Sequence, residues 1–462
     1  MRLSRFFGSS GVFALLVSEI FLILTAYVLA FNFVVRVDPL VFLVYNKGLL
    51  RIGIVIGTLL LGFYLQDMYE DLRVRSRVIL VQQVALAFGI AFIVQTVLNY
   101  VSRELLLPRW VMFTGSAIAL VAVIGWRILY SHFLESAIHA ERVVFLGISR
   151  LAREIDQRFT EKPQLGMTGI GYIGNHSDND CGIPETFILG PIEDFRRIIE
   201  EKRPDRIVVA LPEDRLPLPH SDLLDLKFSG IVVQDAPSAY EAAFERVCVR
   251  ELHPSELIFS EVLGPRPGTV FVQSLYSTAI AAILLLITAP VSLLVAALVK
   301  LTSRGPILFR QTRVGLRGAV FVLYKFRSMY HEAEAGTGAV WAAKDDPRVT
   351  PLGRWLRKYR LDELPQVVNV LKGDMSIVGP RPERPEFVER LIEQIPFYRQ
   401  RLCVKPGLTG WAQINYKYGD TLEDTVTKLE YDLYYIRHLT PTLDAYIMLH
   451  TLKVILLGKG AQ

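Results

Sequence analysis

The sequence predicts three parts: an α-helical membrane bundle (residues 1–140), a doubly wound α/β domain (141–267), and a mainly α-helical third part (268–462) that begins with a re-entrant membrane helix. Apolar residues make up 51% of the 462 residues and the mean hydropathy is +0.33, which is high for a soluble protein. Four apolar stretches of membrane-spanning length crowd the first part, and a fifth opens the third. Between them, short apolar runs alternate with helical patterns.

Each of the four N-terminal stretches is about 20 residues long, enough to cross about 30 Å of hydrocarbon as a helix. No small-residue cleavage site follows the first stretch, so we expect a retained helix and not a cleaved signal peptide. The predicted helices cover residues 12–31, 49–65, 78–98 and 110–130.

The basic residues around these helices predict their orientation. The opposite loops also carry some positive charge, so the bias is modest, but cytoplasmic flanks are typically the more basic ones. We therefore expect a multi-pass protein with a cytoplasmic N-terminus and a cytoplasmic exit after the fourth helix. The flanking residues that favour this orientation are Arg2, Arg5, Arg73, Arg75, Arg77, Arg127 and Arg142.

The middle part alternates short apolar runs with helical patterns, which is typical of βαβ units and a doubly wound sheet. The turn after its first strand runs from Gly147 to Ala152 and holds only the first glycine of a G-x-G-x-x-G motif. We therefore favour a structural role, or a homodimer through this domain, over cofactor binding. The predicted strands are 142–147, 169–173, 187–189, 206–211 and 230–233, and the helices are 151–159, 192–202 and 221–228.

Charge and cysteine content exclude some classes of protein. The formal net charge is +5, which on a membrane protein reflects cytoplasmic loops and anionic headgroups better than a nucleic-acid partner. Cys181, Cys248 and Cys403 show no CxxC or Cys/His spacing, so neither a disulfide framework nor a zinc site is indicated.

The fifth apolar stretch, residues 275–301, has Pro290 near its middle. Proline removes one backbone donor and clashes with the preceding turn, so a helix should kink or break there. Length alone allows a simple spanning helix, but a fifth crossing would place the basic run that follows outside the cell. We therefore predict a helix–break–helix that enters and leaves the same leaflet, with the break at Pro290 and membrane lipids around it.

Basic and apolar residues alternate in the third part. Lys325 and Arg327 are two positions apart, which would place them on one side of an extended segment. Thr350 is a plausible N-cap with Pro351 at the first helical position. The amphipathic, basic pattern continues over residues 352–364 and is typical of a helix at a membrane interface, although a half-buried surface helix would look similar.

Asp362 and Glu363 end this basic pattern. The later Gly379-Pro-Arg-Pro382 segment fixes a rigid backbone that presents Arg381, and residues 405–413 form another glycine-punctuated loop. Arginine forks bind phosphate oxygens, and a carboxylate together with pyrophosphate oxygens holds Mg²⁺. Carboxylates, guanidinium groups and rigid loops beside a membrane predict a phosphate site.

These motifs together resemble the bacterial sugar transferase family, the monotopic polyprenyl-phosphate hexose-1-phosphate transferases, over residues 268–458. The whole chain is similar to the long form, of the undecaprenyl-phosphate glucose phosphotransferase type, which has four N-terminal helices and a Rossmann-like middle domain and starts exopolysaccharide or O-antigen repeat units. One departure is that many relatives carry Ser-Pro at the membrane break, where this chain has Ala289-Pro290. The matching segments are 325–329, 346–350, 361–366, 373–383, 405–411 and 431–435.

The resemblance implies a mechanism. Asp362 would attack the sugar-linked phosphorus of a UDP-sugar and expel UMP, and undecaprenyl phosphate would then take the sugar phosphate from the aspartate. Glu363 would hold Mg²⁺, and we expect Asp362 to stay ionised beside the cations. The resemblance also implies the bacterial inner membrane with a cytoplasmic catalytic domain. The expected phosphate-binding residues are Lys325, Arg327, Arg381 and, less directly, Arg360.

Three alternatives remain open at this stage. The chain could be a membrane scaffold with a decayed transferase domain, although Asp362, Glu363 and the Gly-Pro-Arg-Pro segment are intact. It could be a hydrolase that passes the phosphoryl aspartate to water, or its middle domain could sense a nucleotide and regulate transfer. No residue identifies the sugar, for which glucose or galactose is the expectation.

Overall fold

The structure is a computed structural model, and it describes residues 10–35, 41–43, 47–66, 68–69, 77–101, 107–137, 140–162, 165–175, 182–211, 218–252, 266–330, 346–416 and 421–457. Arg2, Arg5, Arg73, Arg75 and Cys181 lie outside these residues. The parts of the chain are described one at a time.

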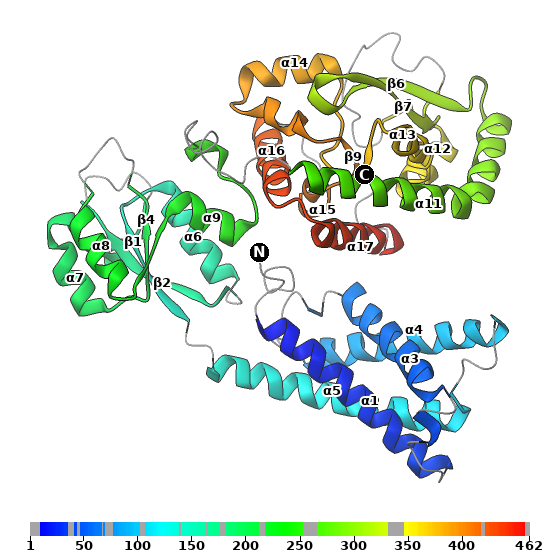
Figure 1. The fold of residues 1–462 in the computed structure, drawn as a ribbon, viewed down its shortest axis with the longest axis horizontal. Helices are drawn as coiled ribbons and strands as arrows, with labels where there is room; N and C mark the ends of the chain where they lie inside the picture. The colour runs from blue at the N-terminus through cyan, green and yellow to red at the C-terminus, as the bar shows by residue number, and fades with distance from the viewer. Residues whose placement is uncertain are drawn as a thin grey trace. The chain divides into compact units, whose positions relative to one another are not determined.

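The four predicted N-terminal segments are helices, each long and apolar enough to cross a membrane (Figure 1). Helix α1 packs along α5, and α3 packs along α4. Gly115 allows a close approach inside the bundle, because a Cβ there would lie 2.5 Å from the ring of Tyr27. The side chains between the helices are apolar and buried, while many on the outside are apolar and exposed. The helices are α1 (Ser10–Val35), α3 (Gly48–Leu65), α4 (Arg77–Val101) and α5 (Arg109–Ala137).

One buried ion pair lies inside this bundle. Arg127 Nε is 2.6 Å from Glu19 Oε1 and Arg127 Nη2 donates to Glu19 Oε2 at 3.2 Å. Tyr69 Oη donates to the same Oε2 at 2.7 Å, and Arg127 Nη1 donates to the carbonyl of Met68 at 2.8 Å. Arg127 is therefore an internal residue of the bundle, within α5, and not a basic residue that flanks the end of its helix.

The middle part forms the predicted doubly wound sheet, with strand order β3-β2-β1-β4-β5 and parallel pairing of β1 with β2 and β4. Figure 1 shows α6 on one face and α7 and α8 on the other. The elements are β1 (Glu141–Leu146), α6 (Arg150–Glu161), β2 (Met167–Ile173), β3 (Ile188–Gly190), α7 (Phe195–Lys202), β4 (Arg206–Val209), α8 (His220–Phe228) and β5 (Val232–Asp235).

Gly147, the one glycine of the dinucleotide-like turn, has a structural explanation. Its φ is +112°, and a Cβ there would lie 2.9 Å from the backbone of Ala210, which follows β4. The next two residues lead into α6, and the Ser149 side chain caps that helix by accepting from Ala152 N. Close packing between two strand ends is enough to require this glycine.

The backbone contacts divide the chain into two compact units, residues 1–233 and 234–462. Helix α9 (Ala236–Phe244), which the sequence analysis assigned to the middle domain, thus groups with the third part. Its Glu241 pairs with Arg437 in α16 (Leu422–Arg437). The unit that holds the candidate site therefore begins before residue 268.

The second unit combines helices with two small sheets, an antiparallel β6–β7 hairpin and a parallel β8–β9 pair. Its elements after α9 are α11 (Pro267–Thr302), β6 (Leu308–Val314), β7 (Val320–Phe326), α12 (Pro351–Lys358), α13 (Gln366–Lys372), β8 (Ser376–Val378), α14 (Pro385–Gln394), β9 (Gly407–Thr409), α15 (Trp411–Asn415), α16 and α17 (Pro441–Leu457).

Helix α11 is continuous, with Pro290 inside it, so two separate helices joined by a break are not what the structure contains. Figure 1 shows that the helix is bent, its first and last parts running in different directions. Proline at position 290 removes the donor for one intrahelical hydrogen bond, which accounts for a bend without ending the helix. It is long and apolar enough to cross a membrane.

The basic helix ends earlier than the sequence pattern predicts. The Thr350 side chain accepts from Gly353 N at 2.9 Å with Pro351 in the first turn, which confirms the predicted start. The α-helix α12 stops at Lys358, Arg360 adopts a left-handed conformation with φ 52°, and Leu361–Glu363 form a 3-10 turn, η9. The prediction that the helix runs to residue 364 is therefore wrong, because the left-handed residue redirects the chain.

Candidate active site

The carboxylate pair lies on the short 3-10 turn η9, which the left-handed Arg360 separates from α12. Strand β7 and the turn are in contact, so Lys325 reaches the pair from the hairpin. Non-glycine residues with this backbone conformation carry a cost of roughly 1–2 kcal/mol and cluster at functional sites. The turn places two acidic side chains in a partly closed, basic environment.

Glu363 is surrounded by cations. Lys325 Nζ donates to Glu363 Oε1 at 3.1 Å and Arg381 Nη2 donates to the same oxygen at 3.0 Å, while Arg360 Nη1 lies 3.9 Å from Oε2. Burial opposes the ionised form, but Lys325, Arg381 and Arg360 outweigh it and hold the pKa of Glu363 well below its usual range. Three of the four predicted phosphate-binding residues therefore converge on one carboxylate.

Asp362 differs from its neighbour. Its side chain is buried, with 8% of the residue exposed, and among the described residues it makes no hydrogen bond or ion pair. Burial and the charge of Glu363 raise the pKa of Asp362, and Lys325, Arg357 and Arg381 offset part of that effect. The expectation was that Asp362 stays ionised beside the cations; burial and Glu363 act against its ionised form, and the cations have their larger effect on Glu363.

Arg357 is a site residue that the sequence analysis did not select. It lies in α12 one turn before the carboxylate pair, its charge acts on Asp362, and its Nε donates to Ser328 Oγ at 3.0 Å. Its charge also acts on Asp346, whose pKa falls to about 2 because Arg348 bonds to it. The one available signal was its position on the basic helix.

The structure separates Arg327 from the predicted site. Its guanidinium donates from Nη2 to Ser303 O at 2.8 Å and Ser303 Oγ at 2.7 Å, and to Val299 O at 3.3 Å. Nη1 donates to Pro306 O. Arg327 thus holds the C-terminal end of α11, whose last carbonyls lack helical partners, whereas Lys325 faces the carboxylates from within β7.

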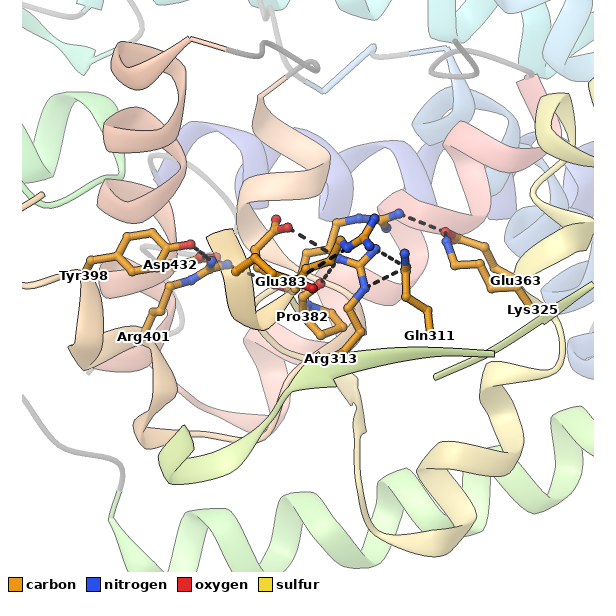
Figure 2. Close-up of polar contacts among 12 residues, drawn as sticks. Gln311, Arg313, Lys325, Glu363, Pro382, Glu383, Tyr398, Arg401 and Asp432 are labelled. Carbon is orange, nitrogen blue, oxygen red and sulfur yellow. Dashed lines mark hydrogen bonds and ion pairs between the residues drawn. The ribbon is translucent and has the colours of Figure 1, made fainter. Parts of the chain in front are cut away.

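Arg381 reaches the site from a loop with a tightly packed backbone. Gly379 N donates to Thr409 O at 2.8 Å, and Gly407 N donates to Pro380 O at 2.9 Å. A Cβ on Gly407 would lie 2.1 Å from Gly379 N, so the two loops can meet only without side chains there. Figure 2 shows Glu363 and Lys325 beside the polar network that supports this loop.

Comparison with known proteins identifies the family. Residues 268–458 match the family described as bacterial sugar transferase. The whole chain is 31% identical over 470 residues to the UDP-glucose:undecaprenyl-phosphate glucose-1-phosphate transferase of Xanthomonas campestris pv. campestris, covering 95% of this chain and 96% of that one. The chain belongs to the bacterial sugar transferase family. It is therefore an enzyme of the transferase class.

Other matches cover less of this sugar transferase. The UDP-N-acetylgalactosamine-undecaprenyl-phosphate N-acetylgalactosaminephosphotransferase of Aeromonas hydrophila is 43% identical over 217 residues, which is 47% of this chain and 50% of that one. A UDP-glucose:undecaprenyl-phosphate glucose-1-phosphate transferase of Klebsiella pneumoniae is 34% identical over 346 residues, 72% of each chain. Residues 64–215 match a family described as CoA-binding domain.

Proposed function

We propose that this sugar transferase moves a hexose 1-phosphate from a UDP-sugar to undecaprenyl phosphate, giving the lipid diphosphate sugar and UMP. The observation that carries the proposal is the buried Asp362–Glu363 pair within a surplus of positive charge. Glu363 engages three cations, whereas Asp362 makes no hydrogen bond or ion pair among the described residues. The names of the relatives give the same class of reaction.

The proposed chemistry has two steps at one phosphorus. A carboxylate oxygen of Asp362 attacks the phosphorus that bears the sugar, and the bond from that phosphorus to UMP breaks, leaving a sugar-phosphoryl aspartate. A phosphate oxygen of the lipid then attacks the same phosphorus and releases the carboxylate. Lys325 and Arg381 stabilise the charge on the phosphoryl oxygens in both steps.

A divalent cation fits this site as the resemblance implies. Among the described residues no three His, Cys, Asp or Glu side chains converge on one point. Mg²⁺ is commonly held by one or two carboxylates together with substrate phosphates, so an ionised Glu363 and a bound diphosphate suffice. The ion would neutralise diphosphate charge and favour departure of UMP.

The contacts of α11 support re-entry into one leaflet. In its first part Gln273 Nε2 donates to Tyr435 Oη at 2.6 Å, and at its other end Ser303 receives Arg327, both within the second unit. A straight helix of its 36 residues would span roughly 54 Å, which would hold those ends far apart. Between them several large apolar side chains are exposed: Ile283, Leu286, Ile287, Leu293 and Leu294.

The proposed location is the bacterial inner membrane, with the second unit on the cytoplasmic face. The same arrangement keeps Asp362 near the headgroup plane, where the lipid phosphate lies, so no charged group enters the hydrocarbon deeply. Glucose or galactose is the expected sugar. The names of the relatives add N-acetylgalactosamine as a further candidate. A homodimer through the sheet domain stays a prediction.

The reaction is tested with purified protein, UDP-sugars labelled in the sugar, Mg²⁺ and undecaprenyl phosphate. We expect label in the organic extract and UMP in the aqueous phase, both lost with EDTA. Asp362→Asn should lower transfer by at least about 10³-fold, because a nucleophile is removed. Omitting the lipid should leave label on denatured wild-type protein and none on Asp362→Asn.

Two outcomes would contradict the proposal. Free sugar phosphate without lipid product would favour hydrolysis, and full transfer by Asp362→Asn would remove that residue as the nucleophile. Glu393→Gln, which changes an exposed carboxyl side chain of α14 in the second unit, is the control and should keep its activity.

Re-entry is tested by single cysteines in a cysteine-free background. Glu251→Cys and Val320→Cys flank α11 at exposed positions, and Val41→Cys lies between the first two membrane helices. An impermeant maleimide applied to intact spheroplasts should label position 41 and leave 251 and 320 unlabelled until lysis. If position 320 is labelled in intact spheroplasts and position 251 is not, α11 crosses the membrane instead.

A further inference from the structure

Two neighbouring carbonyls of the Arg381 loop, those of Arg381 and Pro382, each accept from a guanidinium group. Arg401 Nη2 donates to Arg381 O at 3.0 Å, and Arg313 Nη1 donates to Pro382 O at 3.0 Å. With the glycine contacts to the neighbouring loop, four consecutive residues of this segment are anchored through their backbone. The side chain of Arg381 can therefore approach Glu363 from a fixed base.

Arg401 is itself held by Tyr398 and Asp432. Its Nη1 donates to Tyr398 Oη at 2.6 Å, and its Nη2 lies 2.8 Å from Asp432 Oδ2. Only 2% of Asp432 and 8% of Arg401 are exposed, so both charges need compensation inside the protein, and their ion pair supplies part of it. Figure 2 shows Asp432 and Arg401 at one end of this network and Glu363 at the other.

The charge of Asp432 survives its burial. Burial raises the pKa of Asp432 to about 6, against the opposing effect of Arg401, so the carboxylate is mostly ionised at neutral pH. Glu383 and Lys428 also act on it, in opposite directions. A neutral side chain at position 432 would remove the carboxylate that is paired with the buried guanidinium and leave the charge of Glu383 to act on it, which favours movement of Arg401 toward solvent.

We propose that Asp432, through Arg401, is a positioning residue that fixes Arg381 against the carboxylate pair; this rests on the proposed function. Among the described residues Asp432 pairs with Arg401, and it acts by keeping the Arg401 guanidinium on the carbonyl of residue 381. The side chain of Arg381 is 30% exposed, so its surroundings hold it only in part. The position of its backbone therefore decides where its guanidinium lies. The Asp432–Arg401 ion pair thus contributes indirectly to phosphate binding.

The test is a double-mutant cycle between Asp432→Asn and Arg381→Ala in the full-length protein. If Asp432 acts only through Arg381, Asp432→Asn should lower kcat about tenfold in the wild-type background and less than about twofold when Arg381 is already alanine. Equilibrium dialysis with labelled UDP-sugar repeats the cycle on affinity and does not depend on transfer to lipid.

Glu430→Gln is the matched control, because Glu430 is also a buried carboxylate of α16 and pairs with Arg246, 3.3 Å away, outside the loop network. It should lower the melting temperature as Asp432→Asn does and leave kcat within about twofold. Arg401→Lys, which keeps the charge and loses the fork, should behave as Asp432→Asn and serves if that variant does not fold.

Equal losses from Asp432→Asn in both backgrounds would overturn the proposal, as would an unchanged kcat and affinity in Asp432→Asn. Failure of the proposed function is separate: wild-type protein would then form no lipid product, while the binding cycle would still report whether position 432 acts through Arg381.

Discussion

The membrane bundle and the candidate active site each bury a carboxylate against guanidinium groups, and their charge balance differs. In the membrane bundle one carboxylate, Glu19, meets one guanidinium, Arg127, and Tyr69 and a backbone carbonyl take the remaining bonds. At the candidate active site the cations around the two carboxylates outnumber them. These cations are Lys325, Arg357, Arg360 and Arg381.

The difference separates a structural pair from an anion site. A balanced, bidentate pair such as Glu19–Arg127 has no charge left for a ligand, and it fixes the register of two packed helices. A surplus of cations is unfavourable in the free protein unless an anion arrives, and a sugar diphosphate or lipid phosphate supplies that anion. The excess positive charge is therefore better evidence of function than burial of the carboxylates.

The largest effect on stability should come from breaking the balanced pair. Arg127→Leu leaves Glu19 buried without a counter-charge, so we expect the free energy of unfolding to fall by about 3–5 kcal/mol. Thermal melting in detergent measures this, and transfer per folded molecule should not change. Replacing both partners by leucine should recover most of the loss, and a double variant as unstable as the single one would contradict the assignment.

Removing a surplus cation should have the opposite signature. Lys325→Met leaves Glu363 with Arg381 and Arg360, so the melting temperature should hardly change. Transfer should fall by about 10²–10³-fold, as when one preorganised donor to a transition state is removed. Lys372→Met is the control, since that exposed lysine donates to Tyr324 Oη and should be neutral. Loss of stability with intact transfer would make Lys325 structural.

The elements of the fold that depend on local sequence patterns were predictable from the sequence. Hydropathy located the membrane helices within a few residues, and alternating patterns gave the parallel sheet and its order of elements. The cap at Thr350 followed from residue type and the neighbouring proline. Lys325, Arg360 and Arg381 were expected to bind phosphate because the motifs resemble a known family, and their contacts with Glu363 were not predicted.

Local patterns failed where tertiary contacts decide. Lys325 and Arg327 look equivalent in sequence, but β7 ends between them and the carbonyls at the end of α11 take Arg327. Asp432 and Arg401 are 31 positions apart and show no pattern that links them, although their side chains form an ion pair. Nothing in the sequence indicated that the backbone of Arg360 is left-handed, since most residues with this conformation are glycine.

The smallest predicted effect concerns Arg360, the residue with the left-handed backbone. Arg360 has φ 52° and its Nη1 is 3.9 Å from Glu363, a longer contact than those of Lys325 and Arg381. Arg360→Ala and Arg360→Gly remove the same charge, and only glycine relieves the backbone. We expect similar transfer, reduced less than about tenfold, with the glycine variant more stable than the alanine variant by about 1 kcal/mol.

Chemical denaturation of the two variants side by side measures that difference, because the lost contact with Glu363 cancels between them. If glycine is the more stable, the turn that separates α12 from the carboxylates is held in a strained conformation by the surrounding contacts. Equal stability would mean that the backbone conformation costs nothing at residue 360. The redirection of the chain before Asp362 would then need no strain, and the surplus of cations alone would distinguish this region from the balanced pair in the bundle.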